Sequence, residues 1–399
     1  MASQPKSAAC PEKRLLVCCA RTRLQPEIAA EIRQLVAQPV DWAFLLFEAA
    51  ENSVTPLLER QLSAAAPDAL PAKFLAQLKS ATRANTVRCL FLTAELKRLL
   101  SAFESRGMVA IPYKGPVVAQ QAYGDINLRE FEDLDIILRQ CDLPRAHEIM
   151  LEMGYQAKFP WILSRDAAAA LVPGEYNYRD VARRIMVELH TEITLRHFPV
   201  VPDLEELWRR LVSISLGGQE VRTFQAEDAL PILCIHGSKD FWERLSWIAD
   251  ISELVQAHPR LDWDAVQMRA ESFKAQRMLK LGLTLANNLL DAPLPREIKE
   301  SASSDSSVGA VAQVAETRLL TRHTPHLGAV GRLQFRRRLI AGQWAGWRYA
   351  ARLAVVPAEE DWMMLRLPPS LAPLYIVLRP FRLLHKYGWP GRRSPRVSA

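Results

Sequence analysis

The sequence predicts an α+β fold in which a small mixed β-sheet is flanked by N-terminal and C-terminal α-helices. Long segments at both ends of the 399-residue chain have apolar residues three and four positions apart, which is the period of a helix. Between residues 106 and 200, short alternating or aliphatic runs are separated by turns and helix-like stretches, which indicates a compact α/β core. Hydrophobic residues make up 49% of the chain, which is enough for a sizeable core.

The N-terminal part divides into a flexible segment, residues 1–25, and a helical region, residues 26–105. The apolar stretch of residues 15–20 is too short for a secretion signal and is followed by arginines rather than by a cleavage site. From Pro71 to Phe103 the chain has no glycine and keeps helical spacing, so one or two helices are expected there.

The central unit, residues 106–200, reads as alternating strands and helices. The stretch that ends in Gly154 is amphipathic and fits a helix, whereas the runs before and after it are rich in β-branched and aliphatic residues. The expected order is strand, helix, strand, helix, strand and strand, over residues 107–115, 116–124, 129–139, 143–153, 155–159 and 183–193.

After the core we expect a helical domain over residues 201–300, which begins with the helical pattern of residues 204–214. A serine-rich linker follows at residues 301–310. The last region, residues 311–399, is basic and contains helical pieces, and its end is expected to be disordered.

Charge is unevenly distributed. The whole chain has a net charge of +7, but the segment from Thr317 to Ala399 alone carries 15 Lys and Arg against 3 Asp and Glu, so the remainder is acidic. Such asymmetry favours an anionic partner, either nucleic acid, a nucleotide, an acidic surface or an anionic membrane. For a membrane, the attaching segment would be Leu371–Lys386. Tryptophans interleave with arginines in this region, as they do in nucleic-acid binders and in packed helix interfaces: Trp344, Trp347, Trp362 and Trp389.

Several classes of protein are excluded by what the sequence lacks. The six cysteines show no C-x-x-C pair, which argues against a zinc ribbon or a disulfide framework. No apolar run approaches the roughly 20 residues of a spanning helix, so a cytoplasmic protein without a transmembrane segment is expected. There is no Walker motif, so the chain is not a P-loop ATPase.

The strongest candidate for chemistry is the pair Asp133 and Asp135, which precedes the aliphatic residues 136–138. Residues two apart on a strand point to the same face, so both carboxylates would lie side by side. Their repulsion is relieved when they share a divalent cation, and Mg²⁺ prefers such oxygen ligands together with substrate phosphates.

Two further segments support this site. Lys114 and Gly115 form a turn between an expected strand and helix, where backbone N–H groups and the lysine charge can hold phosphate. Glu188 lies on the later alternating strand and can supply a third carboxylate, with His190 on the same face. Three carboxylates beside a phosphate-holding turn indicate phosphoryl transfer with two metal ions.

Other polar residues have a structural and a functional interpretation. Arg129 can bind phosphate or pair with Glu130 or Glu132. His190 can form a structural hydrogen bond or act in catalysis. A later polar stripe would lie on one face of a single helix, facing either the cleft or solvent, and Lys239 flanks it: His236, Asp240, Glu243, Trp247 and Asp250.

In order along the chain, these motifs resemble those of the uncharacterised nucleotidyltransferase family, a branch of the polymerase-β-like nucleotidyltransferase superfamily. The resemblance runs from about residue 40 to 390. It rests on Asp41-Trp42, Lys114-Gly115, Tyr123-Gly124-Asp125, Arg129, Asp133-x-Asp135, Glu188-Leu189-His190, His236-Gly237, Trp242, Trp247, Asp250 and Leu378-Arg379-Pro380.

The resemblance implies an enzyme that moves a nucleoside monophosphate from an NTP such as ATP to a hydroxyl acceptor, with release of pyrophosphate. Asp133, Asp135 and Glu188 would be catalytic and would hold Mg²⁺, with Mn²⁺ as the alternative. The acceptor would be a small molecule, a protein or RNA, and RNA would engage the basic C-terminal region. The nucleotide-binding residues would be Lys114, Gly115, Arg129, His190, His236 and Lys239.

A catalytically inactive nucleotide- or nucleic-acid-binding module of the same fold is the alternative. The turn Gly115-Pro116 lies further from Asp133 than is usual in the superfamily, and Glu188 stands where Asp is commoner. Both departures are compatible with either hypothesis.

Overall fold

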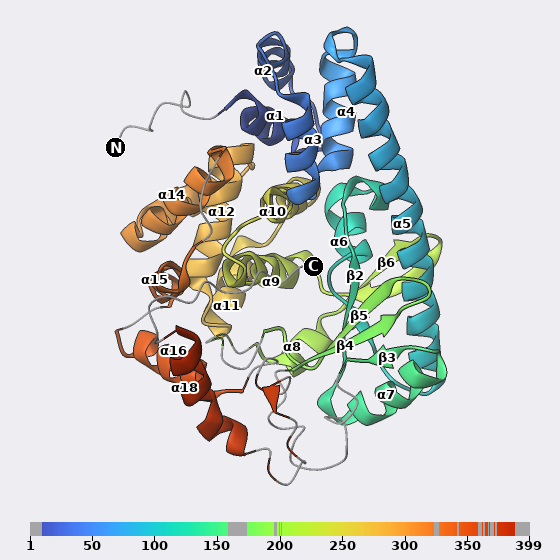
Figure 1. The fold of residues 1–399 in the computed structure, drawn as a ribbon, viewed down its shortest axis with the longest axis vertical. Coiled ribbons are helices and arrows are strands. Elements are labelled where there is room, and N and C mark those ends of the chain that lie inside the picture. The colour runs from blue at the N-terminus through green and yellow to red at the C-terminus, as the bar shows by residue number, and fades with distance from the viewer. Residues whose placement is uncertain are drawn as a thin grey trace.

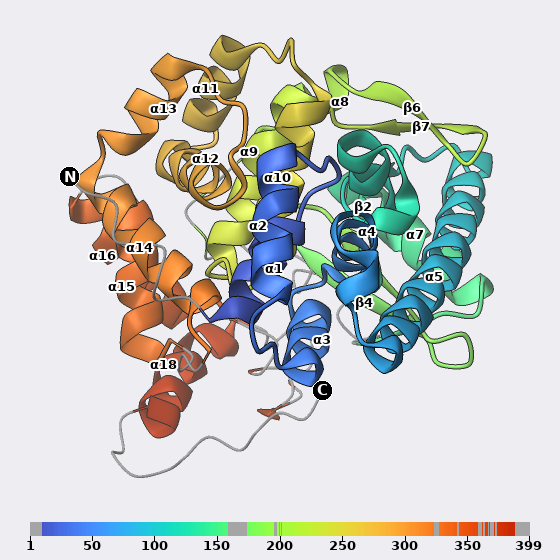
Figure 2. The same ribbon diagram turned by 90° about the horizontal axis from the view of Figure 1, so that it is seen from above.

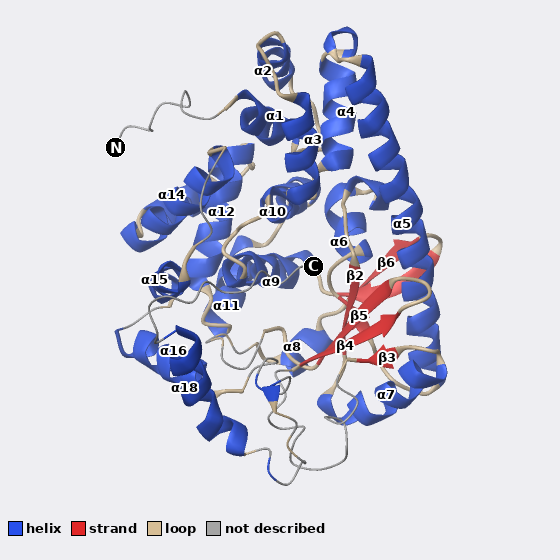
Figure 3. Cartoon of the chain, viewed as in Figure 1, coloured by secondary structure: helices blue, strands red, loops and turns tan. Residues whose placement is uncertain are grey.

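The protein was analysed as a computed structural model, which describes residues 10–158, 174–194, 202–322, 327–340, 343–357 and 373–387 together with a few residues between these segments. Helices dominate, and the strands are confined to one half of the molecule (Figure 3). A long helix borders the sheet on one side, and the C-terminal helices lie on the opposite side of the molecule (Figures 1 and 2). The α+β fold is confirmed.

Four short helices at the N-terminus pack together at one end of the molecule (Figure 1). Leu15 and Leu16 of the first helix are buried, so residues 11–19 form part of the core and the expectation of a flexible segment up to residue 25 is wrong there. Residues 1–9 lie outside the described part of the chain. The four helices are α1 (Pro11–Cys19), α2 (Pro26–Val36), α3 (Trp42–Glu51) and α4 (Thr55–Ala65).

A single helix, α5 (Ala72–Ser105), follows and has 34 residues. It begins directly after Pro71, as the fixed backbone angle of proline allows, and nothing in its sequence interrupts it. Its residues Leu92, Leu96 and Phe103 are buried in the core cluster that it shares with the sheet. The helix therefore forms one wall against which the sheet is built (Figure 1).

The sheet has five strands in the order β1-β2-β5-β4-β3. The pair β2 and β5 is parallel and the three other pairs are antiparallel, so the sheet is mixed as expected. The helix α7 (Leu143–Glu152) connects β2 to β3. The strands are β1 (Ile111–Pro112), β2 (Asp133–Ile137), β3 (Gln156–Ala157), β4 (Glu175–Asp180) and β5 (Ile185–His190).

The two faces of the central strands differ in chemistry. Leu134 and Ile136 of β2, with Val187 and Leu189 of β5, are buried in the core cluster that contains α5 and α7. The alternate residues of both strands point to the other face, because side chains alternate along a strand. This other face carries the carboxylates and is the one toward the helical domain.

A β-hairpin follows the sheet where the sequence analysis expected a helix. The helix α8 ends at Arg209, and the strands β6 (Val212–Leu216) and β7 (Gln219–Thr223) follow, joined by Gly217 and Gly218. Both glycines have positive φ, 55° and 78°, which a two-residue hairpin turn requires. The prediction of a helix over residues 204–214 is therefore correct only for α8 (Leu204–Arg209).

Six helices form the domain that faces the sheet. The expected serine-rich linker at residues 301–310 is wrong, since helices occupy this stretch except for Ser304 and Asp305. Asp305 caps the helix that begins at Ser306 by accepting hydrogen bonds from backbone N–H groups, and its carboxylate pairs with Arg277 at 2.8 Å. The six are α9 (Ala226–Lys239), α10 (Leu245–Ala257), α11 (Trp263–Ser272), α12 (Gln276–Leu290), α13 (Arg296–Ser303) and α14 (Ser306–Leu320).

The stripe from His236 to Asp250 does not lie on one helix, as expected from its spacing. The chain turns between α9 and α10, where Phe241 and Trp242 have positive φ values of 61° and 51°. The Trp242 ring fills the space above Gly237, where a Cβ atom would lie 2.6 Å from the ring. The Trp242 ring thus packs directly on α9 at this turn, and His236 and Asp250 lie on different helices.

The basic C-terminal region adds helices α15 (Ala329–Leu339), α16 (Gln343–Val355) and α18 (Leu374–Tyr387). Arg336 of α15 packs on Phe241 with its guanidinium carbon 4.6 Å from the ring centroid. This favours the packing interpretation for that arginine. The expected disordered end beyond residue 387, together with Trp362 and Trp389, lies outside the described residues. In the part of the chain that is described, no helix has the length and apolar character needed to cross a membrane.

Candidate active site

The parallel pairing of β2 and β5 brings the predicted carboxylates together. In its register Asp135 is opposite Glu188, and Ile137 is opposite His190. Opposite residues of neighbouring strands share a face, so Asp133, Asp135, Glu188 and His190 all lie on the face away from α5. The sequence predicted each of these residues, and the structure shows that the strands carrying them are adjacent.

Three of these side chains form a cluster with metal-ligand spacing. The ligand atoms of Asp135, Glu188 and His190 all lie within 4.8 Å of one another. His190 Nε2 is 3.0 Å from Asp135 Oδ1 and 3.5 Å from Glu188 Oε2. Asp133 is adjacent but is not a member of this cluster.

The turn after β1 adds a positive charge to the cluster. Lys114 Nζ donates a hydrogen bond of 2.8 Å to Asp135 Oδ1, and both side chains are largely buried. Gly115 has a φ of 56°, and a Cβ atom there would lie 3.4 Å from the backbone oxygen of Asp133. Glycine therefore allows the Lys114 turn to approach β2 closely.

The helix after this turn is too short to hold phosphate by its terminus. The α6 helix spans only Pro116–Val118 and continues as a π-helical turn over Ala119–Tyr123. The positive charge of this turn is therefore that of the Lys114 ammonium.

The charges at the site are unequally balanced. Burial opposes ionisation of Asp135, but Lys114 and His190 outweigh it and hold the pKa of that carboxyl below its usual range. Burial and the charges of Asp135 and Glu188 raise the pKa of Asp133 to about 7. At Asp133, burial and the two neighbouring carboxylates thus outweigh the charges of Lys114 and Arg129, and the oxygen ligands on this side fit a hard divalent cation.

His190 carries positive charge at this site. Burial would lower the pKa of its imidazole, but the hydrogen bonds to Asp135 and Glu188 raise it to about 9. Its ring also packs edge-on against Tyr113, with the centroids 5.3 Å apart.

The helix α9 supplies the opposite wall of a small pocket. His236 and Lys239 line this pocket together with Lys114 and His190. Burial, with the charges of Lys114 and Lys239, holds the pKa of His236 well below its usual value. The sequence prediction that His236 and Lys239 face the same site as Lys114 therefore agrees with their positions. The remaining lining residues are Tyr113, Gly174, Glu175, Glu192, Ile193, Thr194 and Ile232.

Sequence analysis missed two polar groups at this site. The hydroxyls of Tyr113 and Thr191 are buried and have no hydrogen-bond partner among the described residues. Tyr113 lines the pocket, and Thr191 directly follows His190. The sequence could have indicated both residues, because Tyr113 directly precedes Lys114 and Thr191 directly follows His190. These two hydroxyls are therefore candidates for a hydrogen bond to a bound molecule.

Arg129 does not line the pocket. Its guanidinium forms two hydrogen bonds with Asp250 of α10, of 2.8 and 2.9 Å, and the Tyr123 hydroxyl donates a third to the same carboxylate. Neither Glu130 nor Glu132, the partners considered from the sequence, pairs with it; the Glu130 carboxylate instead accepts from the backbone N–H of Thr55. Arg129 thus connects the segment before β2 to the helical domain.

Comparison with known proteins agrees with this arrangement. The model of the family described as "Uncharacterised nucleotidyltransferase" matches residues 38–291, which ends well before the limit near 390 expected from the motifs. No curated protein matches the chain. Among solved structures, an antigenic nucleotidyltransferase-like protein from Paracoccidioides brasiliensis matches at 16% identity and a TM-score of 0.30, over 53% of this chain and 92% of that one. The family match covers more than half of the chain and includes every residue of the site, and the chain therefore belongs to the uncharacterised nucleotidyltransferase family.

Proposed function

We propose that this protein transfers a nucleoside monophosphate from an NTP to a hydroxyl acceptor in a reaction that depends on a divalent cation. The observation that carries the proposal is the shared face of β2 and β5. There Asp133, Asp135 and Glu188 meet the ammonium of Lys114 in a chain that belongs to a nucleotidyltransferase family.

The donor set fits the cation. Asp133, Asp135 and Glu188 would hold Mg²⁺, with Mn²⁺ as the alternative, through their carboxylate oxygens, and His190 would orient Asp135 and Glu188 by hydrogen bonds. Bound there, the cation would neutralise the triphosphate and polarise the α-phosphate.

The positive side chains around the pocket would position the triphosphate. Lys114 pairs with Asp135 in this structure. With a divalent cation as the counterion of Asp135, the Lys114 ammonium could turn to the phosphates. Lys239 and the neutral His236 on the opposite wall offer a charge and a hydrogen bond. Holding the phosphates between two walls orients the α-phosphate for attack.

The reaction needs one proton transfer. Glu188 accepts the proton of the acceptor hydroxyl, the oxygen forms a bond to the α-phosphorus, and the bond from that phosphorus to the bridging oxygen breaks. Pyrophosphate then leaves with both electrons of that bond. Glu188 can take this role because its side chain is only partly buried, whereas Asp135 is enclosed by Lys114 and His190.

The test is transfer of label from each α-³²P NTP, in Mg²⁺ or Mn²⁺, to the protein itself, to RNA or to added small acceptors. Asp133→Ala and Asp135→Ala should abolish transfer while the fold is retained. Glu132→Ala is the matched control, because Glu132 is exposed on the same segment and should leave transfer intact.

Two outcomes would contradict the proposal. Transfer that survives in both aspartate variants would exclude these carboxylates from the chemistry. NTP binding without transfer to any acceptor, unchanged in both variants, would instead establish an inactive nucleotide-binding module.

A further inference from the structure

The C-terminal helix α18 is oriented with its charged residues inward. Arg379 is 4% exposed, and its guanidinium donates to the carboxylate of Asp361 and to the backbone oxygen of Leu353. Arg382 pairs with the other oxygen of the Asp361 carboxylate. A buried arginine pair of this kind fixes the rotation of the helix about its axis.

The next turn of the helix toward its N-terminus is held by a tyrosine. Tyr375 is buried, and its hydroxyl donates to the backbone oxygen of Leu365 and accepts from the backbone N–H of Leu367. The inward face of α18 is therefore anchored by polar contacts at two successive turns.

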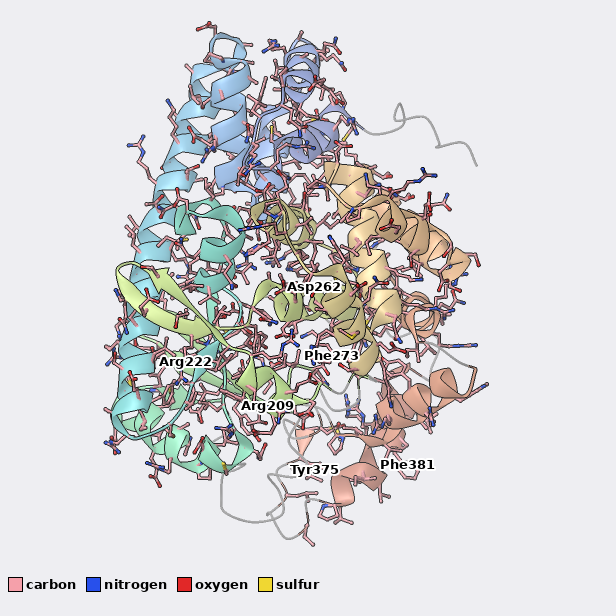
Figure 4. The ribbon with its side chains drawn as sticks, turned by 180° about the vertical axis from the view of Figure 1, so that it is seen from behind. Arg209, Arg222, Asp262, Phe273, Tyr375 and Phe381 are labelled. Carbon is pink, nitrogen blue, oxygen red and sulfur yellow. The ribbon has the colours of Figure 1, made fainter. Side chains whose placement is uncertain are left out.

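The outward face of α18 is apolar. Its exposed residues recur three and four positions apart, which places them on one side of the helix. Figure 4 shows one of them, Phe381, with the inward-held Tyr375 on the same helix. The exposed side chains are Leu374 (45%), Val377 (58%), Phe381 (67%) and Leu384 (66%).

This pattern is the reverse of a surface helix in water. A soluble protein gains by turning such residues inward, since burying each one stabilises the fold. Contiguous exposed apolar surfaces instead mark sites that another surface covers. Here the ion pairs of the buried Arg379 and the partly buried Arg382 with Asp361 hold the polar side of the helix inward.

The sequence around α18 indicates what covers it. After Asp361 the chain has seven Lys and Arg and no acidic residue. Asp361 accounts for two of the arginines, which leaves five positive charges in the same stretch of sequence as the apolar helix face. An apolar helix face flanked by basic residues is the pattern that inserts into the headgroup region of anionic lipid. The five are Arg366, Lys386, Arg392, Arg393 and Arg396.

We propose that α18 docks the protein on an anionic lipid surface, with Val377, Phe381 and Leu384 inserted, and that the positive charge of this stretch of sequence favours anionic headgroups. The proposal is independent of the transferase reaction, since it concerns binding to a surface and no residue of the pocket takes part.

The test is co-sedimentation of the full chain with vesicles of phosphatidylcholine alone and of phosphatidylcholine with phosphatidylglycerol. We expect binding to the anionic vesicles that weakens with salt, because surface charge is screened. Val377→Ser/Phe381→Ser should reduce that binding by about tenfold or more, since two inserted apolar side chains are lost.

The matched control is Leu90→Ser/Phe91→Ser on α5. These residues are also exposed, 54% and 41%, but the basic residues that follow them, Lys97 and Arg98, bond to the backbone oxygen of Gly217 and to Glu95, so lipid binding should be unchanged. Unchanged thermal unfolding of both variants would confirm that neither has lost its fold.

A separate variant tests the charge. Arg392→Ala/Arg393→Ala/Arg396→Ala should lose the preference for anionic over neutral vesicles.

Wild-type protein that stays in the supernatant with anionic vesicles would overturn the proposal. So would equal binding to both kinds of vesicle, or a dimer without lipid that Val377→Ser/Phe381→Ser dissociates, because a second copy would then cover this face. Retention of RNA that depends on the three arginines, without vesicle binding, would likewise overturn it.

Discussion

At the scale of single residues, the hydroxyl of Tyr113 tests whether the pocket binds substrate. Because it is buried without a partner among the described residues, Tyr113→Phe removes no bond within the described protein. We expect the melting temperature to stay the same or rise. If the hydroxyl bonds to substrate, kcat/KM should fall by about 2- to 10-fold, the value of one hydrogen bond. Steady-state kinetics and a thermal melt on the same variant distinguish substrate binding from a structural role. A structural role would lower the melting temperature.

Arg129 gives a second residue-scale prediction. Arg129→Ala leaves the carboxylate of Asp250, which is 1% exposed, without its main counterion. The free energy of unfolding should fall by about 3 to 5 kcal/mol, as expected when one partner of a buried ion pair is removed. Arg106→Ala is the control, because the side chains of Arg106 and Glu152 are 50% and 58% exposed, and its cost should be less than about 1 kcal/mol. Urea denaturation of both variants measures the difference. Equal losses would contradict the structural role of Arg129.

The sequence predicted those site residues whose signal is local. Asp133 and Asp135 are two residues apart, and Glu188 and His190 repeat that spacing on an alternating strand. The partner of Arg129 could not be predicted in this way, because Asp250 is 121 residues further along the chain and is brought close only by helix packing. The acidic neighbours Glu130 and Glu132 were nearer in sequence but do not pair with it.

At the scale of secondary-structure elements, the carboxylate of Glu95 connects α5 to the sheet. It accepts hydrogen bonds from the Tyr155 hydroxyl at 2.5 Å and from Arg183 at 2.9 Å, the latter in the turn between β4 and β5. Burial would raise the pKa of Glu95, but Arg98, Tyr155 and Arg183 outweigh it and hold that pKa below the usual 4.5. A carboxyl with a lowered pKa stabilises the fold above its unfolded pKa, and this contribution is lost as the pH falls through the folded pKa.

Glu95→Gln should therefore destabilise the protein most at neutral pH. The difference in melting temperature from wild type should shrink as the pH falls below about 4.5, where Glu95 of the unfolded chain begins to protonate, and on through the lower pKa of the folded protein. Glu152→Gln is the control, since Glu152 forms only an exposed pair and should show little effect at either pH. Melting temperatures at pH 7 and pH 4 measure this, and a pH-independent loss in Glu95→Gln would show that shape rather than charge matters there.

Elements in which apolar residues recur at one spacing over many residues were predicted well, and short polar strands were not. The helical spacing from Pro71 onward continues without a break as α5. The strand β4 has the sequence EYNYRD, in which only the tyrosines are apolar, and no strand was expected there. The hairpin of β6 and β7 was missed although Gly217 and Gly218 between two alternating runs are a hairpin signal. The helical pattern just before it outweighed that signal.

At the scale of the whole molecule, the helices after residue 291 lie beyond the family match, and α15 reaches back to the pocket. Arg336 donates a hydrogen bond of 2.8 Å to the backbone oxygen of Lys239, and another to the hydroxyl of Tyr349 on α16. Because Lys239 lines the pocket at the end of α9, the C-terminal region holds one wall of the candidate site. Arg336 is one of the basic residues whose charge suggested an anionic partner, but it bonds within the protein instead.

Arg336→Ala should therefore affect the site from outside it. Without the contact, the end of α9 is less well fixed, so we expect KM for the NTP to rise by about 2- to 10-fold, within the range of one lost hydrogen bond, while kcat changes little. Arg337→Ala is the matched control, since Arg337 is exposed on the same turn and should leave both constants unchanged. Kinetics of the two variants at equal salt separate this local effect from loss of net charge, because both remove one positive charge. An equal rise of KM in both would mean that the C-terminal region acts through its charge rather than by holding α9.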